Sequence, residues 1–136
     1  MTHISHKPML NNADINRPDV LAEVNAAFDA YEQALVTNDV EALDELFWAS
    51  PLTLRYGAGE NLYGHEAIRK FRQGRPATQL MRTVTERQIT SFGADMAVAN
   101  IEFRRDGSDR IGRQSQTWAR MPEGWRVVSA HVSLML

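Results

Sequence analysis

The sequence predicts an α+β domain in which three N-terminal helices pack on one face of a strongly curved antiparallel sheet. In the first half of the chain, apolar residues recur every three or four positions, which is typical of helices. The second half alternates apolar and polar residues between turn signals, which is typical of strands. Helices followed by consecutive strands favour an α+β layout. We expect a conical cavity between the helices and the bent sheet, lined by the first helix.

Length and composition indicate one domain. A chain of 136 residues is long enough to bury a core without disulfides or metals. The absence of cysteine excludes thiolate chemistry, and a net charge of -2 disfavours nucleic acid as a partner. No apolar run reaches the length of a signal peptide or membrane span, so a cytoplasmic location with no membrane partner is expected. We predict a flexible tail over 1–14 and a single domain over 15–136.

Helix signals divide the N-terminal half. Asn16 offers an N-cap and Pro18 fits the first turn of a helix that runs to about Thr37. Its apolar stripe comprises Val20, Val24, Ala27, Phe28, Tyr31 and Leu35. A short second helix is expected to reach Trp48, with Pro51 ending it, and a third follows over 65–73 with Gly74 as its stop.

Strand signals occupy the remainder. A strand over 52–57, a turn and a short return strand lie between the second and third helices. Four longer strands, over about 80–92, 96–105, 110–121 and 125–135, are separated by turn signals and predict an antiparallel meander.

Three side chains are candidates for chemistry near the cavity. Tyr31 lies within an apolar helix stripe, so its hydroxyl either bonds a core partner or points into the cavity. Arg55 lies mid-strand, either on a solvated face or facing the cavity with an anionic partner. Arg75, held between Gly74 and a proline, is placed to cap the cavity mouth. Arg69 and Arg72 are expected on the solvated helix surface.

The last two strands carry an unusual set of polar residues. Gln114, Gln116 and Trp118 share one parity, and Ser129, His131 and Ser133 share one face of the final strand. Such rows can line a polar cavity or bond a second subunit, and a lone histidine is more often structural than an acid. Parity alone does not say which face is concave, because a β-bulge would change it.

Five ungapped runs carry a family resemblance: INRPDVLAEV, YEQALVTNDVEALDELFW, RYGAGENLYG, GRQSQTW and RMPEGWRVVSAHVS. Over roughly 15–134 the chain resembles the AtzH and HpxZ family, in the SnoaL-like branch of the nuclear transport factor 2-like superfamily. The resemblance implies a cystatin-like cone, a homodimer formed through the sheet, and an association with amidases of ureide or s-triazine breakdown. One branch is linked to oxalurate catabolism, and the other to decarboxylation of 1,3-dicarboxyurea to allophanate. The shared motifs do not separate these branches.

The resemblance also implies site residues. A tyrosine on the first helix and an arginine on the first strand, here Tyr31 and Arg55, correspond to the catalytic pair. Loss of carbon dioxide from an N-carboxylate needs a proton donor near nitrogen and groups that fix carboxylates, so no metal or organic cofactor is expected. We expect the substrate to be bound by Arg75, Gln116, Trp118, His131 and Ser133.

Three functional hypotheses remain open at this point. The first is a cofactor-free lyase that acts on a small carboxylated urea. The second is a non-catalytic binding protein that serves a partner amidase, and the third is a structural protein whose polar hairpin face pairs subunits.

Overall fold

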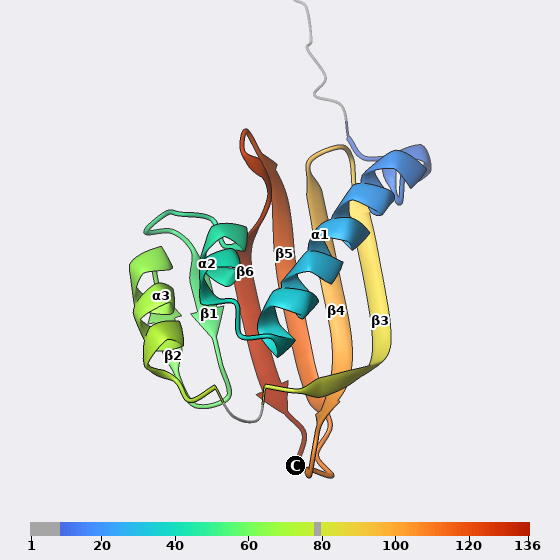
Figure 1. Cartoon of the computed structure of the whole chain (residues 1–136). Coiled ribbons are helices and arrows are strands. Elements are labelled where there is room, and N and C mark those ends of the chain that lie inside the picture. The colour runs from blue at the N-terminus through green and yellow to red at the C-terminus, as the bar shows by residue number, and fades with distance from the viewer. Residues whose placement is uncertain (1–8, 78–79) are drawn as a thin grey trace, which may run out of the picture.

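One curved sheet with helices on one face makes up the protein (Figure 1). The computed structural model describes residues 9–77 and 80–136. The helices are α1 (Pro18–Val36), α2 (Val40–Leu46) and α3 (His65–Gly74). The strands are β1 (Leu54–Tyr56), β2 (Asn61–Tyr63), β3 (Arg82–Phe92), β4 (Met96–Arg105), β5 (Gly112–Met121) and β6 (Gly124–Leu134). This arrangement confirms the predicted α+β fold.

The six strands are ordered β2-β1-β6-β5-β4-β3, so the predicted meander of the last four strands is confirmed. The sheet is mixed rather than wholly antiparallel, because β1 pairs with β6 in parallel. The reason lies at the end of α2, where Phe47 forms a parallel bridge with Val127 and the chain continues in that direction. This pairing also ends α2 at Leu46. The prediction that the second helix reaches Trp48 is therefore wrong.

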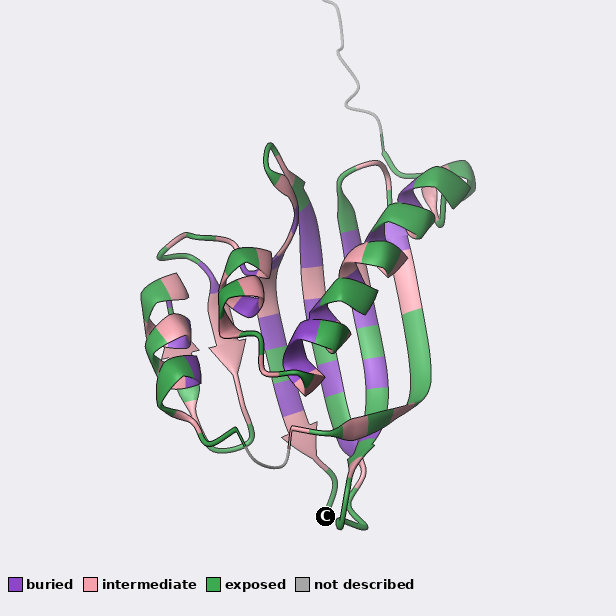
Figure 2. Cartoon of the chain, in the orientation of Figure 1, coloured by how far each residue is buried: buried purple, intermediate pink, exposed green. Residues whose placement is uncertain are grey.

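Helix α1 crosses the face of β3, β4 and β5, and it buries the predicted stripe except Ala27, which is partly buried (Figures 1 and 2). Its N-cap position is Arg17, which makes no side-chain cap, so the prediction of Asn16 as N-cap is wrong. Asn16 has a positive φ of 56°, and its side-chain oxygen accepts a hydrogen bond of 2.9 Å from the backbone N–H of Ser91. This bond ties the start of α1 to the end of β3.

The start of the chain is more ordered than the sequence predicted. Residues 1–8 of the expected tail lie outside the described residues. Asn12–Asp14 form a 3-10 helix with Asn11 as its N-cap, and the side chains of Asn11 and Asp14 complete a capping box. Ile15 then bridges to Phe92. Residues 11–14 of the predicted tail therefore have regular structure.

Two β-bulges set which side chains face the helices. In β6, Val128 is the extra residue, because Thr117 pairs with Ser129 whereas Trp118 pairs with Val127. Because of the bulge, odd-numbered residues face the helices before Val128 and even-numbered residues face them after it. The buried positions are Trp125 and Val127 before the bulge and Ala130 and Val132 after it. In β3, a second bulge falls between Val84 and Glu86 and bends the start of that strand.

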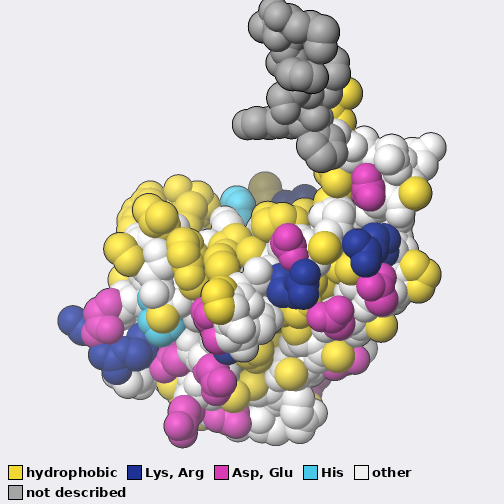
Figure 3. All heavy atoms as spheres, turned by 90° about the horizontal axis from the view of Figure 1, so that it is seen from above, with side chains coloured by type: hydrophobic (Ala, Val, Ile, Leu, Met, Phe, Trp, Pro, Cys, Tyr) yellow, Lys and Arg dark blue, Asp and Glu magenta, His cyan; other side chains and the backbone are white. Residues whose placement is uncertain are grey.

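Hydrophobic side chains also gather on the surface, on the side where α2, α3, β1 and β2 lie (Figure 3). Leu52 and Tyr63 in this region are 77% and 64% exposed. A shallow pocket here shares no residue with the arginine-lined cavity described below, and it is lined by Ala49, Ser50, Pro51, Tyr63, Gly64, His65 and Glu66. Within the described ranges, no helix combines the length and hydropathy needed to cross a membrane.

Candidate functional site

A cavity rich in arginine lies between α1, α3 and the helix-facing side of the sheet. An inner chamber of about 40 Å³ adjoins an outer chamber of about 300 Å³. Both are lined by Arg55, Arg75, Leu80, Arg105 and Val132. The inner chamber adds Tyr31, Leu35, Arg72, Arg82 and Gln114. Five guanidinium groups therefore surround one small space.

Three of these arginines are neutralised by carboxylates. The pairs are Arg55 with Glu60 at 2.8 Å, Arg72 with Asp44 at 2.6 Å, and Arg82 with Glu32. The side chains of Arg72 and Arg82 are only 4% and 2% exposed, and burial at this level requires such partners. Arg72 and Arg82 also lie over the rings of Phe47 and Phe103.

The other two arginines, Arg75 and Arg105, have no carboxylate partner within 4.0 Å in the part of the chain that the structure describes. The Nε and Nη2 atoms of Arg75 are buried without a hydrogen-bond partner among the described residues. Burial, followed by the charge of Arg72, lowers the pKa of Arg75. Burial, followed by the charge of Arg82, lowers the pKa of Arg105. Five guanidinium groups and three carboxylates leave two positive charges, which suits a dianion.

Tyr31 reaches this cavity from the middle of α1. The residue is 5% exposed, and its ring packs between Phe28 and Phe47 at centroid distances of 6.3 and 6.2 Å. No hydrogen bond to its hydroxyl is found within residues 9–77 and 80–136. Tyr31 is close enough to Arg75 that an electrostatic interaction with Tyr31 opposes the lowering of the Arg75 pKa. Of the two alternatives for this hydroxyl, the geometry favours the one that points into the cavity.

Arg55 enters the cavity from β1, opposite Tyr31. Its side chain is 13% exposed, so the mid-strand arginine faces the cavity rather than open solvent. The turn after β1 supplies Glu60, and the guanidinium carbon lies 5.7 Å from the centroid of the Phe71 ring. With only Nη1 bonded to Glu60, the remaining N–H groups of Arg55 can still donate to a carboxylate.

Gln114 adds a neutral donor to the inner chamber. It is 2% exposed, and its Oε1 accepts a hydrogen bond of 3.2 Å from Arg82 Nη2. The Gln114 Nε2 atom is buried and has no hydrogen-bond partner among the described residues. The sequence had placed this glutamine in a polar row but had not singled it out.

The other polar residues of that row lie outside the cavity. Gln116 and Trp118 are buried beneath α1, where Trp118 Nε1 donates to Gln116 Oε1 at 3.1 Å. Each step of two residues moves a side chain by about 6.6 Å along a strand, which carries the row away from the cavity. The expectation that these two residues bind the substrate has no support from the cavity geometry.

His131 and Ser133 lie on the opposite, outer face of the sheet. His131 packs edge-on against Tyr56 at 5.6 Å, and Ser133 Oγ accepts a hydrogen bond of 3.2 Å from Arg113. The Val128 bulge explains this placement, because it puts Ala130 and Val132 on the inner face instead. The sequence-based expectation that His131 and Ser133 line the same site as Tyr31 is wrong.

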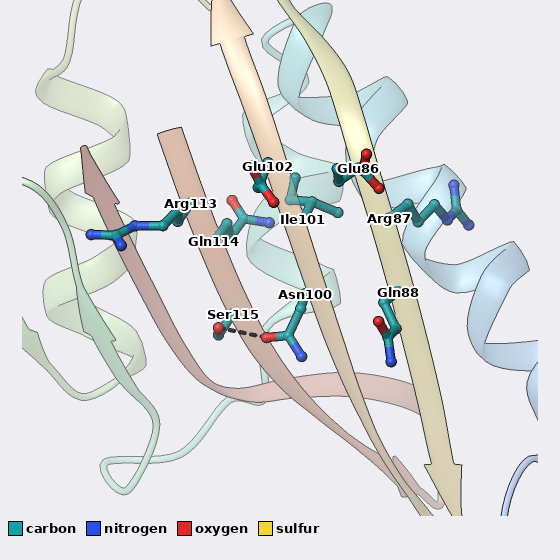
Figure 4. A pocket seen from close by; sticks show the side chains of 9 residues that line it. All are labelled: Glu86, Arg87, Gln88, Asn100, Ile101, Glu102, Arg113, Gln114 and Ser115. Atoms are coloured by element: carbon teal, nitrogen blue, oxygen red, sulfur yellow. Dashed lines mark hydrogen bonds between the residues drawn. The ribbon is translucent and has the colours of Figure 1, made fainter. Parts of the chain in front are cut away.

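The outer face carries an open groove over β3, β4 and β5, seen with the helices behind the sheet in Figure 4. Gln114 borders both this groove and the inner chamber of the cavity. The groove has a volume of about 320 Å³. At its centre Ser115 Oγ donates to Asn100 Oδ1 at 2.6 Å. Its rim carries both charges, from Glu86, Glu102 and Arg113. Neither this groove nor the rest of the described chain gathers three His, Asp or Glu side chains that could hold a metal ion.

Three cavity arginines were missed from the sequence. Arg72 was expected on the surface, although it follows Ile68 by four residues and therefore shares its buried helix face. Arg82 and Arg105 pair directly across β3 and β4, where both strands reach the cavity. No sequence signal marked them, because the bend of β3 depends on its bulge.

A helical layer on one face of a curved sheet, with a cavity between them, is the architecture of the cystatin-like class of nuclear transport factor 2-like proteins. A protein of unknown function from Pseudomonas putida, described as NTF2-like, shares this fold with a TM-score of 0.73 at 14% identity, over 86% of this chain and 87% of that chain. Within the class, the chain belongs to the AtzH-like family, whose model matches residues 13–136.

Two similar solved structures support this assignment. A protein of unknown function from Pectobacterium atrosepticum, from the DUF3225 family, is 59% identical over 94% of this chain and 100% of that chain, with a TM-score of 0.93. A cystatin-like fold protein from Burkholderia xenovorans is 47% identical over 89% and 95% of the two chains, with a TM-score of 0.85. No curated protein matches the chain.

Proposed function

We propose that the protein is a cofactor-independent decarboxylase that converts an N-carboxylated urea, 1,3-dicarboxyurea, to allophanate and carbon dioxide. The observation that carries this proposal is that Arg75 and Arg105 have no carboxylate partner among the described residues, in a cavity that also holds Tyr31. Buried positive charge without a protein partner is unfavourable, and an anionic ligand supplies the missing partner.

The charge and size of 1,3-dicarboxyurea match the cavity. The molecule carries one carboxylate at each end, and the cavity carries two guanidinium charges in excess of its carboxylates. The inner chamber, of about 40 Å³, admits a group about the size of one carbonyl. The outer chamber holds the remainder of the ligand.

The reaction requires one bond to break and one proton to move. The bond between nitrogen and the departing carboxylate carbon breaks, its electron pair stays on nitrogen, and carbon dioxide leaves. Nitrogen takes the hydroxyl proton of Tyr31, and solvent then restores the tyrosine. Because tyrosine is a weak acid, with an ordinary pKa of about 10, the transfer needs a cation near the oxygen that is left, and Arg75 interacts electrostatically with Tyr31. Arg55 anchors a carboxylate through its free N–H groups.

A non-catalytic role for the same cavity is the second candidate. The AtzH-like family and this fold support a catabolic enzyme or a ligand-binding protein, and the close structural relatives are of unknown function. A candidate dehydratase from Streptomyces avermitilis and a candidate ketosteroid isomerase from Parabacteroides distasonis share the fold alone, at 19% and 16% identity. A protein that captures a dianion for a partner amidase would use the same arginines but would not need the Tyr31 proton.

A homodimer formed through the outer face of the sheet is part of the proposal. Glu86, Glu102 and Arg113 put both charges on that face, around the uncharged pair Asn100 and Ser115. A two-fold axis near this pair lets opposite charges meet, because an isologous interface brings the same patch together twice.

The direct test is carbon dioxide release from 1,3-dicarboxyurea generated in place by an amidohydrolase. The proposal predicts that release, and the accompanying appearance of allophanate, is faster with the protein than without it. An unchanged rate, together with saturable binding of the dianion, would favour the capture role instead.

A further inference from the structure

We infer that Gln114 is a substrate-binding residue whose amide N–H donates a hydrogen bond to the central carbonyl oxygen of the bound dianion. The identity of that ligand rests on the proposed function. Guanidinium groups would then bind the two charged ends of the ligand, and the neutral amide would bind its neutral centre.

The orientation of the Gln114 amide is fixed by its neighbours. Arg82 can only donate hydrogen bonds, so the amide oxygen of Gln114 must face Arg82 Nη2, at 3.2 Å. Arg82 is itself held, because it bonds Glu32 and lies 4.4 Å from the centroid of the Phe103 ring. The Nε2 atom of Gln114 is therefore the end of the amide that is left to bind a ligand.

This Nε2 group has no partner within the described residues, although Gln114 is 2% exposed and lines the inner chamber. Buried donors are nearly always satisfied, so an unsatisfied donor at a cavity wall points to an acceptor brought by a ligand. Carboxylates are drawn first to the charged Arg75 and Arg105. A carbonyl oxygen is the acceptor that suits a neutral amide.

The same hydrogen bond would assist the proposed reaction. When carbon dioxide leaves, the electron pair on nitrogen delocalises onto the neighbouring carbonyl oxygen. A fixed donor at this oxygen stabilises that charge more strongly than it stabilises the starting carbonyl, as donors in oxyanion holes do. Gln114 then acts on specificity and on rate through one contact.

Gln116 offers a matched control on the same strand. It shares the inner face of β5 with Gln114, it is 1% exposed, and its Nε2 atom is also without a partner in the described part of the chain. Gln116 lines neither chamber of the cavity, and its Oε1 accepts from Trp118. Removing its amide therefore tests the loss of a buried glutamine without the loss of a cavity donor.

The test compares two dianions by calorimetric titration: 3-oxoglutarate, which has a central carbonyl, and glutarate, which lacks one. Because 3-oxoglutarate is a β-keto acid that slowly loses carbon dioxide in water, it is dissolved fresh and its intact concentration is checked after each titration. Wild-type protein and Gln116→Met are expected to bind 3-oxoglutarate about five- to tenfold more tightly than glutarate, the effect of one hydrogen bond. Gln114→Met is expected to lose this preference while keeping its glutarate affinity within about twofold. A preference that survives in Gln114→Met, or is absent from wild type, overturns the inference.

Gln114→Glu provides a second test if Gln114→Met does not fold. It keeps both the size of the side chain and an acceptor for Arg82. Its added charge weakens both dianions alike, so the ratio of the two affinities still reports the carbonyl contact and is expected to fall to about one. None of these readouts depends on turnover. A retained preference without decarboxylation would contradict the proposed function alone, whereas decarboxylation without a preference would contradict the role of Gln114 alone.

Discussion

Arg72 and Arg75 lie three residues apart at the end of α3, yet they differ in what surrounds their charges. Arg72 is paired with Asp44 and lies over Phe47, so its charge is compensated within the protein. Arg75 has buried nitrogen atoms without partners in the described part of the chain, and its pKa is lowered by burial. The first arginine supports the fold, and the second is the one that we propose binds the anionic ligand.

This difference predicts opposite effects of two matched substitutions. Arg72→Leu leaves Asp44 without its partner and is expected to lower the free energy of unfolding by about 3 kcal/mol. Arg75→Leu removes an uncompensated charge and is expected to leave that free energy unchanged or raise it by about 1 kcal/mol, while glutarate binding weakens at least tenfold. Urea unfolding and calorimetry measure both quantities. Equal destabilisation by the two variants would contradict this assignment.

Strands and helices differ in how far the sequence predicted them. The stripe of α1 and the meander were predicted because their periodicity is local. The faces of β6 were not, since the Val128 bulge reverses parity in mid-strand. The site shows the same division: Tyr31, Arg55 and Arg75 meet in the cavity, whereas Arg82 and Arg105 reach it through strand pairing and a bend that no local pattern reveals.

Two substitutions at Asn16 test how the start of α1 is stabilised. Asn16 combines a positive φ with a hydrogen bond to the Ser91 N–H. Asn16→Ala loses the bond and strains the backbone, so a loss of about 2 kcal/mol in the free energy of unfolding is expected. Asn16→Gly loses only the hydrogen bond and is expected to lower the free energy of unfolding by about 1 kcal/mol. Equal costs in urea unfolding would mean that the backbone conformation contributes nothing.

The whole molecule presents two different faces: helices cover one face of the sheet (Figure 2), and the polar groove lies on the other (Figure 4). The arginine-lined cavity lies on the helix side. The proposed homodimer would cover the open face without closing the cavity. This separation explains why the polar residues of β5 and β6 divide into two groups. Gln114 faces the cavity, whereas Ser115, His131 and Ser133 face outward.

The proposed dimer predicts a mass of twice 15.4 kDa by light scattering. Asn100→Arg places two like charges near the proposed two-fold axis and is expected to shift the protein to the monomer mass. Glu41 is exposed on α2, away from this face. Glu41→Arg also adds positive charge and is expected to leave the mass unchanged. A wild-type monomer, or a dimer that tolerates Asn100→Arg, would contradict the interface.

The most direct test of the central claim follows carbon dioxide release from 1,3-dicarboxyurea in wild type, Tyr31→Phe and Tyr56→Phe, with glutarate affinity measured on the same samples. Tyr56 lies on β1 and stacks against His131 on the outer face, so it controls for loss of a tyrosine hydroxyl. We predict that Tyr31→Phe loses at least about a hundredfold in kcat and keeps its glutarate affinity, while Tyr56→Phe retains both. Full turnover by Tyr31→Phe would contradict the account of the cavity as a site of proton transfer.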